Sequence, residues 1–169
     1  IRSEIQSAQG SNHTFALAHF PIGCINSDEH PAFNSRFFFR DAFGDSVTAY
    51  FSGHLHKTRM YYANDNFLDL NLNDFKSDSY YRVNVVDNDI YTFVDVNINT
   101  WPVIAVTNPI DARIMARTDK WERMGRSTEM RMLIFSPNPI VTILIYLDGR
   151  LQTEVRNGVA VINSFTTDG

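Results

Sequence analysis

Two short apolar segments of the sequence each run into histidine. Residues 14–18 lead into His19, and residues 46–51 lead through a serine into Gly53-His54-Leu55-His56. Imidazole is the commonest protein ligand for borderline divalent metals. On an extended strand His54 and His56 would point to opposite faces, but where a strand turns into a loop they can approach one site from two sides. These residue types favour metal binding, with His19, His54 and His56 as candidate ligands.

Each of these signals also has a plainer structural interpretation. His-x-His occurs by chance on solvated turns, and His19 alone would more often be a core histidine with a satisfied partner. A site is favoured because two buried strands both end this way, and ligands collect at the C-terminal ends of strands in layered α/β folds. We therefore expect the three candidate ligands to converge at one sheet edge, with His13 and His30 outside the cluster.

Other polar motifs are weaker candidates. Asp28-Glu29-His30 has D-x-H spacing but lies in a polar loop, and Asn12-His13-Thr14 is a turn or an N-glycosylation acceptor. Basic residues between 112 and 127 indicate a solvated loop rather than a phosphate clamp: Arg113, Arg117, Lys120, Arg123 and Arg126. The sequence has no nucleophile elbow, phosphate-binding glycine loop or dinucleotide fingerprint.

The pattern of apolar residues predicts the β-rich framework that positions these side chains. Residues 1–9 indicate the end of a helix that stops at Gly10, and residues 14–18 and 46–51 indicate strands buried on both faces. Residues 67–72, 81–85 and 91–96 alternate with period two and predict an antiparallel meander with a turn at 87–89.

A second β region is predicted to begin near Trp101-Pro102. Strands are expected at 101–109, 130–135, 141–147 and 159–165, with hairpin turns at Asp148-Gly149 and Asn157-Gly158. The sequence thus divides into residues 1–100 and an immunoglobulin-like sandwich at 101–169, which is expected to be incomplete because a full one needs ~100 residues. The fold class is mainly β (α+β), and no long helix is expected after Phe67.

Composition excludes several classes of protein. The chain has 169 residues, a net charge of −4 and a pI of about 5.7, so no nucleic-acid partner is expected. A lone cysteine, Cys24, excludes a disulfide framework and a cysteine-cluster zinc site. No apolar run approaches the ~18 residues of a membrane span, and residues 1–10 lack an apolar stretch, so no signal peptide is expected in them. Both ends are interpreted as cuts within a longer protein.

Residues 15–21, Phe-Ala-Leu-Ala-His-Phe-Pro, followed by residues 51–56, Phe-Ser-Gly-His-Leu-His, resemble the C-terminal part of the calcineurin-like metallophosphoesterase domain. Further segments resemble the subgroup of that family typified by transmembrane protein 62: residues 68–70, 74–76, 80–86, 89–90, 93–96, 101–104, 107–109, 134–136 and 145–149. The resemblance implies the C-terminal half of a two-layered metallophosphoesterase β-sandwich followed by an immunoglobulin-like region.

The resemblance implies a two-metal hydrolase in the intact parent. His19 and His54 would bind one divalent ion and His56 the other; the ions, of Mn, Fe, Zn or Mg, activate a hydroxide that attacks a phosphate-ester substrate. No other catalytic residue is assigned. The parent is expected to be membrane-associated through segments absent here, and this piece is expected to be soluble.

The sequence departs from the family in lacking its earlier motifs. D-x-H, G-D-x-x-D and G-N-H-[DE] supply the remaining ligands in that family and are absent as a set here. The N-terminal half of the phosphoesterase domain is therefore an expected partner, and the chain alone is expected to be inactive and to bind metal poorly. The alternative is a non-catalytic β-rich interaction module with a vestigial histidine cluster.

Overall fold

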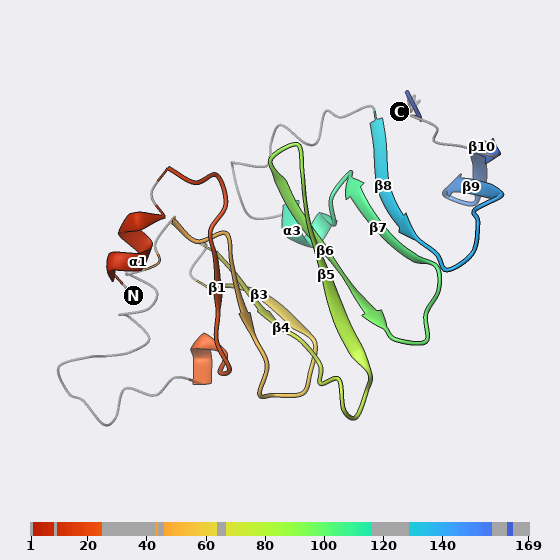
Figure 1. The fold of residues 1–169 in the computed structure, drawn as a ribbon. Coiled ribbons are helices and arrows are strands. Elements are labelled where there is room, and N and C mark those ends of the chain that lie inside the picture. The colour runs from red at the N-terminus through yellow and green to blue at the C-terminus, as the bar shows by residue number, and fades with distance from the viewer. Residues whose placement is uncertain are drawn as a thin grey trace. The chain divides into compact units, whose positions relative to one another are not determined.

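A computed structural model describes residues 2–8, 10–24, 43, 46–63, 67–115, 129–156 and 162–163. Strands dominate this part of the chain, and its helices are short (Figure 1). They are α1 (Arg2–Ser7), the single 3-10 turn η1 (Ile22–Cys24) and α3 (Ala112–Met115). Over the described residues, the expectation of a mainly β chain with no long helix after Phe67 is confirmed. None of the helices in these ranges is long and apolar enough to cross a membrane.

The strands fall into two compact units of the chain. The first unit comprises residues 1–83 and 95–98, and the second comprises residues 84–94 and 99–169. The strands are β1 (Phe15–Leu17), β2 (Ala49–Ser52), β3 (Arg59–Ala63), β4 (Phe67–Asn71), β5 (Tyr80–Asp87), β6 (Ile90–Asn97), β7 (Val103–Asn108), β8 (Glu129–Phe135), β9 (Thr142–Leu147), β10 (Arg150–Arg156) and β11 (Ile162–Asn163).

A four-stranded mixed sheet forms the centre of the first unit. Its order is β1-β2-β4-β3, in which β1, β2 and β4 run parallel and β3 pairs antiparallel with β4. Every residue of β4 is buried, as is typical of a central strand covered on both faces. Its apolar core cluster is Ile22, Phe43, Val47, Tyr50 and Phe67, and Ile5 of α1 packs against it. The helix expected to stop at Gly10 is present, and Gly10 has a φ of 96°.

Two expectations for this unit are wrong. Period-two alternation at residues 67–72 predicted the first strand of an antiparallel meander with residues 81–85 and 91–96. Instead β4 pairs with β2 and β3, and its polar residues Asp69 and Asn71 are fully buried. Alternation misled because Asp69 Oδ2 and Asn71 Nδ2 form hydrogen bonds with neighbouring loops, which offset part of the cost of burying these side chains. β1 was expected to be buried on both faces. Among the described strands it lies instead at an edge of the sheet, and its Leu17 is 77% exposed.

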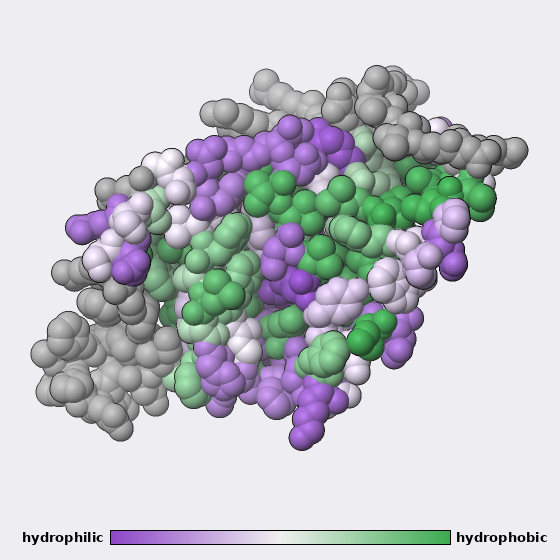
Figure 2. Space-filling model, in the orientation of Figure 1, coloured by the Kyte–Doolittle hydropathy of each residue, from purple (hydrophilic) through white to green (hydrophobic). Residues whose placement is uncertain are grey.

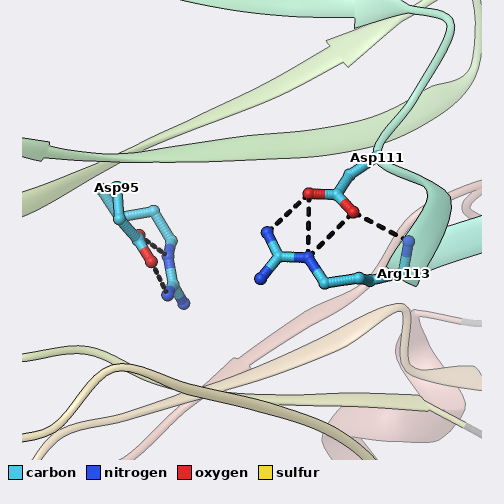
Figure 3. Close-up of polar contacts among 4 residues, drawn as sticks. Asp95, Asp111 and Arg113 are labelled. Carbon is cyan, nitrogen blue, oxygen red and sulfur yellow. Dashed lines mark hydrogen bonds and ion pairs between the residues drawn. The ribbon is translucent and has the colours of Figure 1, made fainter.

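The β5–β6 hairpin has its base in the first unit and its tip in the second. Asn88 and Asp89 at the turn have φ values of 48° and 62°, the left-handed pair that a type I′ turn requires, so the predicted turn at 87–89 is confirmed. Near the base, Arg82 Nε and Nη2 donate hydrogen bonds to the two carboxylate oxygens of Asp95 at 2.6 and 2.8 Å. Figure 3 shows this bidentate pair at Asp95.

The second unit is built from hairpin-like antiparallel pairs. β7 pairs with β8, β11 adds to the far edge of β8, and β9 pairs with β10. The predicted turn between β9 and β10 is confirmed by φ values of 49° at Asp148 and 77° at Gly149. The other predicted turn, Asn157-Gly158, lies outside the described residues.

The segment predicted as an exposed basic loop begins instead with α3. Ile114 of this helix is fully buried, and the Asp111 carboxylate accepts a hydrogen bond from the Arg113 amide at 2.8 Å. The Arg113 guanidinium also pairs with Asp111 (Figure 3), and hydrogen bonds from Arg113 hold the Asp111 pKa below its usual value. Residues 116–128, with the other basic residues of that prediction, lie outside the described residues.

Much apolar surface of the second unit is uncovered. Figure 2 shows hydrophobic residues gathered over its strands at the right of the view. Large apolar side chains that are at least two-fifths exposed include Ile104, Val106, Leu133, Phe135, Leu144, Tyr146, Leu147 and Leu151. Among the described residues, these side chains leave apolar surface of the strands open to solvent.

Asp87 of β5 joins the hairpin tip to the β7–β8 pair. Its Oδ2 accepts hydrogen bonds from Thr107 Oγ1 at 2.6 Å and Arg131 Nε at 2.7 Å. Burial alone would raise the Asp87 pKa, but these hydrogen bonds and the Arg131 charge outweigh it and lower the pKa below its ordinary value of 3.8.

We expect Asp87→Asn to lower the free energy of unfolding at pH 7 by about 1–3 kcal/mol, because a charged acceptor is lost from a partly buried network. A carboxyl group with a depressed folded-state pKa stabilises the protein fully above its unfolded pKa, and that contribution is lost as pH falls through the folded value. Urea denaturation should therefore show a lower free energy of unfolding for the variant than for the wild type at pH 7, and a smaller difference between the two near pH 3. Asp148→Asn, in an exposed turn, is the control; an equal deficit there would contradict the assignment.

Candidate metal centre

His19 and His54 meet at one edge of the first unit's sheet. β1 and β2 are parallel neighbours, with Leu17 paired to Phe51, so the segments that follow them leave the sheet side by side. His19 Nε2 lies 3.2 Å from His54 Nδ1, and the two ring centroids are 5.1 Å apart. The expected convergence of these two histidines is confirmed, and both side chains are exposed to solvent.

The backbone around these histidines is tied together and locally strained. The Gly53 amide donates to the His19 carbonyl at 3.0 Å, which links the two loops directly. His54 and His56 have φ values of 66° and 48°, in the left-handed region that costs a non-glycine residue roughly 1 kcal/mol or more. Such conformations persist where the surroundings enforce them, and they cluster at functional sites.

His56 makes a different contact. Its Nδ1 lies 3.8 Å from Asp74 Oδ2, and its side chain is 64% exposed. A hydrogen bond from the Ser77 side chain, together with the nearby His56, holds the pKa of Asp74 below its ordinary value. Within the described ranges, no three His, Cys, Asp or Glu side chains are grouped so as to hold a metal ion. A metal-binding role for His56 therefore remains a prediction.

The His19–His54 geometry fits two ligands of one metal ion. Zinc binds imidazole nitrogen at about 2.0–2.1 Å, so two such bonds at a tetrahedral angle place their nitrogens about 3.3 Å apart. The observed separation of 3.2 Å matches this value. The same distance also suits a hydrogen bond in which one neutral imidazole donates to the other. The pair can hold two positions on an ion, and further ligands must come from other residues.

Of the other histidines, His13 lies before β1 rather than after it. Its Nδ1 is 3.2 Å from Thr48 Oγ1, and its ring stacks on Phe15 with centroids 6.1 Å apart. This places His13 at the opposite end of β1 from His19, as expected. The Asp28-Glu29-His30 motif lies outside the described residues.

Phe20 is a site residue that sequence reasoning missed. Its ring centroid lies 4.8 Å from that of His19 and 4.4 Å from that of His54. Its carbonyl accepts a hydrogen bond from the Tyr50 hydroxyl at 2.6 Å. Burial, with the Asp69 charge nearby, raises the Tyr50 pKa to about 12, so the hydroxyl stays protonated and able to donate. The Phe20 backbone is thus anchored, and its ring packs beside both imidazoles.

The comparisons with known proteins first define a class of domain for the second half. Residues 98–157 match the family model of the TMEM62 Ig-like domain. This match covers the strands of the second unit from β7 to β10, in agreement with the expected immunoglobulin-like region.

A particular relative extends the similarity toward the first half. Over 149 residues the chain is 34% identical to transmembrane protein 62 of Mus musculus. The matched region covers 82% of this chain and 22% of the mouse protein. The chain thus spans about a fifth of the length of the curated relative it matches. No solved structure matches the chain. The family-model match and the mouse relative both support the transmembrane protein 62-like subgroup suggested by the motifs.

Proposed function

We propose that this chain is part of a transmembrane protein 62-like metallophosphoesterase. In this proposal its first half is the C-terminal part of the catalytic domain and its second half is an immunoglobulin-like domain. The intact protein hydrolyses a phosphate ester and is anchored in a membrane through segments outside this chain. The observation that supports the proposal most is the pair of imidazole nitrogens 3.2 Å apart at two parallel strand ends.

The residues of this chain would hold and orient metal ions. His19 and His54 bind one divalent ion through the facing nitrogens, and His56 contributes to the second. When bound, two such ions supply an activated hydroxide and neutralise charge that develops on phosphorus. Phe20 restrains both imidazoles from one side. The remaining ligands come from the N-terminal half of the phosphoesterase domain, and Mn, Fe, Zn and Mg are all candidate ions.

The test is to purify the full-length protein and measure its metal content and its hydrolysis of aryl phosphate monoesters and diesters. Activity should disappear on chelation and return on adding one of the four ions. The 169-residue chain alone should show no turnover and only weak metal binding, because it lacks the family's earlier ligand motifs.

A second candidate function is a non-catalytic β-rich interaction module. It is favoured by the lack of a three-residue metal cluster within the described ranges, and by the fact that the two imidazoles can satisfy each other. Full-length protein that binds no divalent metal and hydrolyses neither ester would exclude the first function and favour this second one.

A further inference from the structure

Two buried polar residues of β4 contact the loops that carry His19 and His54. Asp69 and Asn71 are fully buried, and they alternate with the buried apolar residues Leu68 and Leu70. Because they are two positions apart on a strand, both side chains leave the same side of it. A carboxylate and an amide in the middle of a core strand are costly unless hydrogen bonds satisfy them.

Asp69 holds the loop that follows β1. Its Oδ2 accepts a hydrogen bond from the Ile22 amide at 3.2 Å. Tyr50, the residue of β2 paired with Asp69, donates to the Phe20 carbonyl of the same loop. Pro21 lies between the two anchored positions and has a restricted φ, so the loop is fixed within three residues of His19.

Asn71 holds the loop that follows β2. Its Nδ2 donates to the Gly53 carbonyl and lies 3.3 Å from Ser52 Oγ. The Gly53 carbonyl and the His54 nitrogen belong to the same planar peptide group. Anchoring the carbonyl therefore fixes the orientation of this peptide plane and restricts the φ of His54. The same glycine donates its amide to the His19 carbonyl. A continuous set of hydrogen bonds thus runs from Asn71 through Gly53 to His19.

We infer that Asp69 and Asn71 are positioning residues for the histidine pair. From one strand they fix both loops, and so they set the 3.2 Å separation of His19 Nε2 and His54 Nδ1. Apolar residues at both positions would pack in the core without a desolvation cost, so a purely structural role does not account for them. The inference rests on the proposed function in one respect, namely that the His19–His54 pair binds a metal ion.

The experiment compares matched variants of the full-length protein. Asp69→Leu and Asn71→Leu remove the loop contacts and keep the branched skeleton of the side chain, whereas Asp69→Asn keeps an acceptor oxygen for the Ile22 amide. Affinity for Zn²⁺ should fall about 10–100-fold in both leucine variants and return to near the wild-type value in Asp69→Asn. Leu70→Val, a destabilising change on the same strand at a side chain that cannot hydrogen-bond to either loop, should leave affinity unchanged.

Hydrogen exchange of residues 51–56, followed by mass spectrometry, gives a readout that needs no metal. Exchange should be faster in Asn71→Leu than in Leu70→Val, because the Gly53 carbonyl loses the Asn71 donor that anchors it. The Gly53 peptide is then held only through its amide hydrogen bond to the His19 carbonyl. If a leucine variant fails to fold, Asn71→Ser, which is too short to span the same contact, should show the same faster exchange. Folded variants with wild-type affinity and exchange would overturn the inference. If the wild-type protein binds no Zn²⁺, the proposed function fails. Wild-type exchange in the folded variants would overturn the positioning role whether or not the protein binds Zn²⁺.

Discussion

Replacing His54 with Ala in the full-length protein is expected to remove most bound metal and to lower phosphate-ester hydrolysis by at least about 100-fold. Loss of a group that merely orients a metal ligand typically costs 10–100-fold, and a direct ligand should cost no less. The His54 imidazole is exposed and packs on His19 and Phe20 rather than in the core, so its loss should leave the fold largely intact.

Metal content measured by elemental analysis, together with turnover of an aryl phosphate, checks this expectation. His56→Ala should have a similar effect on hydrolysis, and His30→Ala should have neither effect. Full metal content in both His54→Ala and His56→Ala would reject the metallophosphoesterase interpretation of these residues and favour the interaction module.

The meeting of His19 and His54 could be predicted from sequence because it depends on few steps. Two short apolar runs that each end in histidine become parallel neighbours, and neighbouring parallel strands end at the same sheet edge. The positive-φ turns were predictable for a similar reason. Asp-Gly and Asn-Asp dipeptides tolerate the left-handed backbone that a type I′ turn demands, so local chemistry is sufficient there.

The role of β4 could not be predicted in this way. A leucine-rich strand interrupted by Asp69 and Asn71 has the same alternation as a strand with one face in water. Which situation holds depends on loops far away in sequence, at Ile22 and Gly53, that accept or donate hydrogen bonds. A signal was nonetheless present, because the strand's polar residues were an acid and an amide among leucines rather than long charged side chains.

The partner of His56 was missed for a related reason. Asp74 lies beyond β4, and only the pairing of β2 with β4 brings the two segments after these strands together. Sequence spacing suggested that His54 and His56 act at one site, but the left-handed backbone at both residues changes where each side chain points. Local patterns cannot supply that geometry.

Replacing Arg82 with Ala is expected to give the largest loss of stability, about 3–5 kcal/mol. The Arg82 side chain is 5% exposed and that of Asp95 is 16% exposed, and they share two short hydrogen bonds across the β5–β6 hairpin. Removing the guanidinium leaves a largely buried carboxylate without its principal counter-charge. Natural domains are stable by only about 5–15 kcal/mol, so this loss would be a large fraction of the total.

Urea denaturation followed by circular dichroism measures the effect, and two matched variants show its origin. Arg113→Ala breaks the ion pair with Asp111, but the Arg113 side chain is 71% exposed, so that loss should be no more than about 1 kcal/mol. The double variant Arg82→Met, Asp95→Leu should recover most of the stability lost in Arg82→Ala, because it removes the orphaned charge as well as its partner. If the double variant is as unstable as Arg82→Ala, the loss comes from packing around the arginine stem rather than from an uncompensated carboxylate.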